Sequence, residues 1–120
     1  RLHVLIAVLQ KRAGQNLGQY DVHINVVGGI RADEPAADLA VCLAIASAYK
    51  DKMLGNDLAC FGEVGLGGEI RSVRATDKRI KECEQLGIKR IIAPASRSTE
   101  TKEKITVIGV KNIQELIKHT

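Results

Sequence analysis

The segment from Pro35 to about Lys50 constrains the fold most, because it is a helix-length run dense in Ala, Leu and Ile. Such a run predicts a long and well-buried helix. Asp33 can cap the helix or turn the chain before it, and Pro35 fits the first helical turn. A chain of 120 residues is long enough to bury this helix in one domain, residues 1–120, with its own core.

Helices and strands alternate along the chain. Apolar spacing predicts further helices over residues 2–12, 76–86 and 113–117, and strands over residues 22–26, 58–64, 69–73, 88–93 and 105–110. Gly65, Gly67 and Gly68 are expected to join two of these strands in a tight connection, by supplying positive φ angles. Residues 96–104 are polar and are expected to form a loop. This order predicts a layered α/β or α+β domain.

Cysteine usage and hydropathy exclude several classes of protein. Cys42, Cys60 and Cys83 are odd in number and form no Cys-x-x-Cys pair, so we expect free thiols and no metal site. No apolar run approaches the roughly 20 residues that span a bilayer, and no signal peptide is evident. We therefore expect a cytoplasmic protein without a membrane partner. The chain opens at Arg1, inside a helical pattern, and we interpret it as a fragment of a longer protein.

The charge is unevenly distributed. Residues 61–120 carry twelve Lys and Arg against eight Asp and Glu, which accounts for the whole net charge of +4. This excess is typical either of a phosphate-binding face or of a solvated surface, and composition leaves both open. With one Phe, two Tyr and no Trp, the chain has little material for stacking on bases.

Three motifs carry a family resemblance. They are, in order, Asp33-Glu-Pro-Ala-Ala-Asp38, Phe61-Gly-Glu-Val-Gly-Leu-Gly-Gly-Glu-Ile-Arg-Ser-Val73 and Gly87-Ile-Lys-Arg-Ile-Ile-Ala-Pro94. Together they resemble the C-terminal domain of the Lon protease family over most of the chain. The resemblance implies the fold of that domain, a mixed sheet packed with helices around a βαβ core like that of some ribosomal proteins.

Within that family the chain looks most like the RadA group of bacterial, RecA-related DNA-repair ATPases, which carry such a domain at the C-terminus. The segments that resemble RadA most are Lys11-Arg-Ala-Gly14, Asn25-Val-Val-Gly-Gly-Ile-Arg31, Asp33-Glu-Pro-Ala-Ala-Asp38 and Phe61-Gly-Glu-Val-Gly-Leu66.

The resemblance places Ala36 at the nucleophilic serine of the Lon Ser-Lys dyad and Arg79 at its lysine. Alanine has no nucleophile, and arginine stays protonated and cannot accept the serine proton. Lys78 does not replace the base, because a neighbouring helical residue points about 100° away. We therefore expect no catalytic residue and no enzyme activity in this domain. A divergent serine hydrolase that uses Ser47 or Ser72 is the less favoured alternative.

The resemblance implies a role in DNA repair and recombination. RadA-like proteins are hexameric ring ATPases that act on branched DNA, so ring assembly and sequence-independent DNA binding are expected of this domain. A scaffold that only holds the ring together is the alternative. No Walker motif occurs, so we expect no cofactor here, with ATP, Mg and Zn bound only by other parts of a parent protein. RecA recombinase is a further candidate partner.

Some cations are better candidates than others for contacts to single-stranded or branched DNA. Cations at the ends of elements or beside glycine turns can project toward phosphate from a rigid scaffold, whereas Lys81 is surrounded by acids on its helix. The candidates are Arg12, Arg31, Arg71, Arg74 and Lys111. We expect them to bind the DNA backbone rather than the bases.

Overall fold

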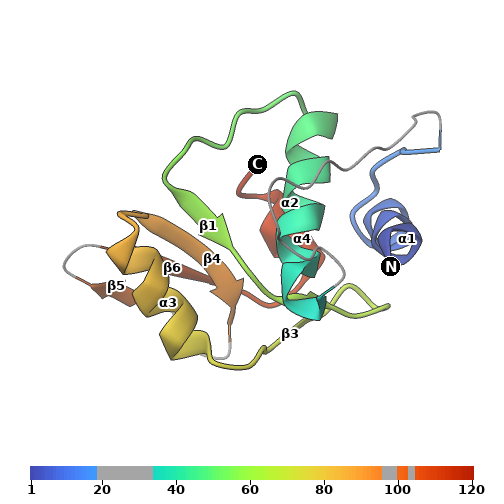
Figure 1. Ribbon diagram of the computed structural model, residues 1–120. Coiled ribbons are helices and arrows are strands. Elements are labelled where there is room, and N and C mark those ends of the chain that lie inside the picture. Colours follow the sequence, from blue (N-terminus) through green and yellow to red (C-terminus); the bar gives the residue numbers. More distant parts are fainter. Residues whose placement is uncertain (19–33, 96–99, 103–104) are drawn as a thin grey trace.

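The structure, a computed structural model, describes residues 1–18, 34–95, 100–102 and 105–120 (Figure 1). Its elements are α1 (Leu2–Arg12), the 3-10 helix η1 (Pro35–Ala37), α2 (Asp38–Tyr49), β1 (Leu58–Cys60), β2 (Glu63–Val64), β3 (Ile70–Arg71), α3 (Thr76–Gln85), β4 (Arg90–Pro94), β5 (Glu100–Lys102), β6 (Ile105–Val110) and α4 (Ile113–Ile117).

The main sheet has the strand order β1-β4-β6-β5. β1 pairs with β4 and β4 with β6 in parallel, while β5 runs antiparallel to β6 at one edge. α3 lies between β1 and β4 in the chain and so forms the crossover that a parallel pair needs. β2 and β3 form a separate antiparallel hairpin. The α/β fold with a mixed sheet is confirmed.

Neighbouring residues of β4 face opposite layers of helices, because side chains alternate along a strand. Ile92 packs in a large core with Leu9 of α1, Leu39 of α2 and Leu116 of α4. Ile91 packs on the other face with Ile80 of α3. The main sheet is therefore covered by α2 and α4 on one side and by α3 on the other, and α1 packs against α2 and α4 (Figure 1).

The long apolar run forms the buried helix that was predicted, entered through a 3-10 turn at Pro35–Ala37. Helices are also confirmed at Leu2–Arg12, Thr76–Gln85 and Ile113–Ile117, and strands at Arg90–Pro94 and Ile105–Val110. The predicted strand over 22–26 and the cap at Asp33 lie outside the described residues.

Two predictions about the strands are wrong. Residues 58–64 form two strands in different sheets, because the chain bends at Gly62, which has a φ of +154°. Part of the expected loop 96–104 pairs with β6, since the backbone of Glu100–Lys102 forms β5. Of the three hairpin glycines, Gly68 alone has a positive φ, +84°.

Candidate nucleic-acid interface

The β2–β3 hairpin closes on itself through short backbone bonds. The amide of Gly65 donates to the carbonyl of Glu69 at 2.9 Å, and the amide of Gly68 donates to the carbonyl of Gly65 at 2.9 Å. The Glu69 carboxylate also accepts the amide of Gly67 at 3.0 Å. Its pKa is lowered, first by a hydrogen bond from its own backbone amide and then by Arg71. The tip is therefore held by backbone bonds and by an anionic side chain.

The hairpin is fastened to two other parts of the molecule. The amide of Ile113, at the start of α4, donates to Gly68 O at 2.8 Å, and the amide of Ile70 donates to Lys111 O at 2.9 Å. A β-carbon at Gly68 would lie 3.1 Å from Cβ of Arg12, so only glycine lets the end of α1 approach this closely. The hairpin thus rests against the end of α1 and the β6–α4 junction.

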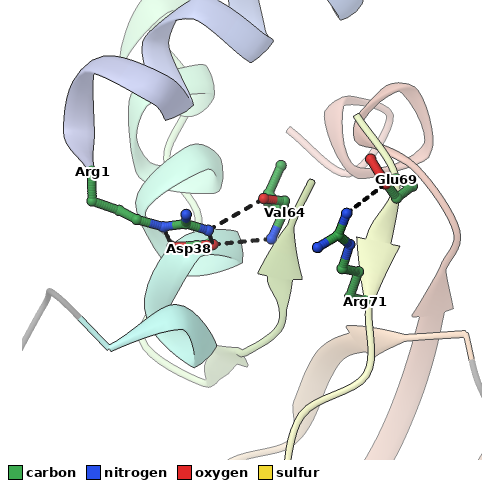
Figure 2. Close-up of polar contacts among 5 residues, drawn as sticks. All are labelled: Arg1, Asp38, Val64, Glu69 and Arg71. Atoms are coloured by element: carbon green, nitrogen blue, oxygen red, sulfur yellow. Dashed lines mark hydrogen bonds and ion pairs between the residues drawn. The ribbon is translucent and has the colours of Figure 1, made fainter. Parts of the chain in front are cut away.

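Three predicted cations gather at this hairpin. Arg12 ends α1, Arg71 ends β3 and Lys111 joins β6 to α4, and all three are exposed. The guanidinium of Arg71 is paired with Glu69 at 3.1 Å, with both side chains about half exposed (Figure 2). Sequence reasoning selected these residues separately, and the fold brings them together from three elements.

The other two predicted cations do not join this group. Arg74 is exposed in the segment before α3, where its carbonyl accepts a hydrogen bond from Nε of Arg79 at 2.9 Å. Arg31 lies outside the described residues.

Ala36 and Arg79, which the resemblance places at the two positions of the Lon dyad, both make structural contacts. Ala36 is 7% exposed, and its carbonyl accepts the amide of Gly62 at 2.9 Å. Arg79 pairs with Glu34 at 3.0 Å and lies over the ring of Phe61, with its guanidinium carbon 5.9 Å from the centroid. Arg79 therefore ties α3 to the turn that carries Ala36.

Ser47 and the three cysteines are placed unfavourably for nucleophilic chemistry, whereas Ser72 is exposed. Ser47 is buried, and its hydroxyl donates to Ala44 O at 3.0 Å in the same helix. Burial raises the pKa of Cys42 to about 12, so this residue is a neutral thiol at physiological pH. Burial likewise raises the pKa of Cys60 and of Cys83.

Within the described residues the chain offers neither a metal centre nor a membrane-spanning helix. There, no three His, Cys, Asp or Glu side chains are grouped so that they could hold a metal ion. In the same part of the chain, no helix has the length and apolar character to cross a membrane.

A buried carboxylate at Asp38 is the main polar feature that sequence reasoning missed. Asp38 is 1% exposed, forms an ion pair with Arg1 and accepts the amide of Val64 at 3.1 Å (Figure 2). A second guanidinium contact runs from Arg1 Nη2 to Val64 O at 3.3 Å. The pKa of Arg1 is raised, first by its hydrogen bond to Asp38. The signal available in the sequence was that Asp38 is the one charged residue in the apolar run from Pro35 to Tyr49.

Comparison with known proteins settles the family. Residues 6–120 match the Lon protease (S16) C-terminal proteolytic domain. The chain belongs to this family. The resemblance drawn from the three motifs is thus confirmed, and the fourth residue of the first motif, residues 33–38, is Ala36.

Proteins named DNA repair protein RadA are similar to this Lon-family chain over nearly its whole length. The identity is 47% over 121 residues for the protein of Streptococcus pneumoniae, which covers 98% of this chain and 29% of that protein. It is 46% over 121 residues for Bacillus subtilis and 42% over 118 residues for Escherichia coli, each covering 98% of this chain and 26% of the relative. The chain therefore spans less than a third of the length of these relatives.

Proposed function

We propose that this Lon-family domain acts in DNA repair as a non-proteolytic module that binds the DNA backbone without sequence preference. The observation that carries the proposal is the convergence of Arg12, Arg71 and Lys111 on one rigid hairpin. The similarity to proteins named DNA repair protein RadA supports the choice of DNA as the polyanion.

The geometry suits phosphate better than a specific base. Cations that project from separate, braced elements can contact successive phosphates, and these contacts carry no sequence information. Ion pairs between solvent-exposed side chains contribute little to stability, so a phosphate can replace the Glu69 carboxylate as the partner of Arg71.

Ring assembly is the second part of the proposal. In a hexameric ring six copies of the hairpin would face a common axis, and their fields would add along a DNA strand. ATP hydrolysis, with its Mg, and any Zn site or contact with RecA recombinase belong to the remainder of a parent protein. A domain that only holds such a ring together is the alternative.

The first test removes the three hairpin cations. Each released phosphate contact changes the slope of log K against log salt by about 0.9 for duplex DNA, so a variant with Arg12→Ala, Arg71→Ala and Lys111→Ala should lose up to about three units of slope. Fluorescence anisotropy with labelled single-stranded, duplex and forked DNA, between about 50 and 200 mM salt, measures this change.

Two further variants sharpen the test. Lys81→Ala removes one positive charge from α3, on the opposite face of the sheet, and should leave the slope unchanged. Glu69→Gln removes the anion that competes for Arg71 and should tighten binding. If the triple variant binds like the unchanged chain, the hairpin does not contact DNA and the scaffold alternative is favoured.

Proteolysis is tested separately with fluorogenic casein. The chain is expected to give no turnover above the buffer blank, because Ala36 has no nucleophile and the hydroxyl of Ser47 is bonded to its own helix. Turnover that disappears on Ser47→Ala or Ser72→Ala would instead establish a divergent hydrolase.

A further inference from the structure

Leu66 occupies an unusual place for an apolar side chain. It is 74% exposed and sits at the tip of the β2–β3 hairpin, between Gly65 and Gly67. Single exposed leucines are ordinary on protein surfaces and need no explanation by themselves. Leu66 differs because both of its neighbours in the chain are glycines, which have no side chain to cover it. In addition, the Arg12 side chain packs against Gly68, and the backbone carbonyl of Lys111 accepts the amide of Ile70 at the base of the same hairpin.

The tip that carries Leu66 is braced. The amide of Gly68 donates a hydrogen bond to the carbonyl of Gly65, and the carbonyl of Gly68 accepts one from the amide of Ile113 at 2.8 Å. The Glu69 carboxylate holds the amide of Gly67 at 3.0 Å, on the other side of Leu66. The tip is thus anchored to the start of α4 by a hydrogen bond and packs against the end of α1.

We infer that Leu66 is a wedge that enters between bases where DNA branches, while Arg12, Arg71 and Lys111 hold the flanking phosphates. Proteins that kink or unstack DNA combine these two features, an inserted apolar side chain and cations on the backbone. The inference rests on the proposed DNA-binding function and adds a contact to the bases. It requires no aromatic residue, which suits a chain with so few.

The surroundings favour DNA over a protein partner for Leu66. The buried centre of a protein–protein interface is depleted in charge, whereas Arg12, Arg71, Glu69 and Lys111 all lie beside this tip. At a DNA junction the same cations face phosphates, and the wedge meets bases that are already partly unstacked. A forked end therefore costs less to open than a continuous duplex.

The test separates opening from binding. A forked duplex with 2-aminopurine at the junction reports unstacking by a rise in fluorescence, and a fluorescein label on the same DNA reports affinity by anisotropy. We expect the unchanged chain to raise the 2-aminopurine signal and Leu66→Ala to lose most of that rise. The affinity of Leu66→Ala should stay within about twofold, because phosphate contacts dominate binding. Leu66→Met should keep the rise, since methionine also serves as a wedge.

Each outcome has one meaning. If the unchanged chain binds forked DNA and Leu66→Ala opens the fork equally well, Leu66 is not a wedge. The proposed DNA-binding function is then unaffected. If the unchanged chain does not bind forked DNA at all, the proposed function fails and the wedge falls with it. If Leu66→Ala lowers the oligomeric mass measured by light scattering and leaves the 2-aminopurine signal intact, Leu66 serves a contact between copies of the chain, and the wedge is overturned.

Discussion

Replacing Asp38 by alanine is expected to lower the free energy of unfolding by about 3 kcal/mol. The substitution leaves the amide of Val64 without its acceptor and removes the anionic partner of Arg1. This value is at the lower end of the destabilisation typical of a broken buried ion pair, because the Arg1 side chain is 36% exposed and can be solvated when Asp38 is absent. Urea unfolding followed by circular dichroism measures the loss.

A double-mutant cycle distinguishes the ion pair from simple loss of packing. Arg1→Ala leaves a buried carboxylate with Val64 as its remaining partner among the described contacts, so this variant should also be destabilised. The variant with both changes should lose less than the sum of the two single losses, since no buried charge then remains unpaired. Strictly additive losses would mean that the two side chains are not coupled. Lys78→Ala, on the exposed face of α3, is the control and should change stability by about 0.5 kcal/mol or less.

Much of the fold was predictable because its signals are local. The helix at Asp38–Tyr49 follows from a dense apolar run, and the strand at Ile105–Val110 from a short one between polar segments. The break within residues 58–64 was not predictable in this way. It depends on Gly62, which turns the chain so that its amide and carbonyl bond to Ala36 and Leu39 far away in sequence. Hydrophobic pattern carries no information about such a tertiary contact.

The candidate site was predictable as a list of residues but not as an arrangement. Each of Arg12, Arg71 and Lys111 was selected by its place at the end of an element, which sequence can indicate. Their convergence depends on the packing of Gly68 against α1 and α4, and no spacing in the sequence encodes it. Arg79 pairs with Glu34, which lies 45 residues away in the chain, and no local pattern in the sequence indicates this contact.

Replacing Gly62 by alanine is expected to destabilise the chain by about 3 kcal/mol, from two sources of similar size. The φ of +154° is one that side-chain-bearing residues rarely adopt. In addition, the new β-carbon would lie 3.1 Å from Leu39 Cδ2, 3.2 Å from Pro94 Cγ and 3.3 Å from Ile70 Cγ2. These atoms belong to α2, β4 and β3, so relief of the crowding requires movement of three packed elements.

Substitutions at two other glycines distinguish the cost of backbone strain from the cost of steric crowding. Gly14 and Gly87 have φ angles of +69° and +79°, and a β-carbon at either would meet no atom within 4 Å. Gly14→Ala and Gly87→Ala should therefore show the backbone cost alone, about 1 kcal/mol each. Urea unfolding of the three variants side by side measures the losses in the free energy of unfolding. Equal losses would show that the atoms around Gly62 can move aside for a β-carbon at little cost. A larger loss at Gly62 would show that α2, the main sheet and the β2–β3 hairpin are packed too closely at this residue to admit a side chain.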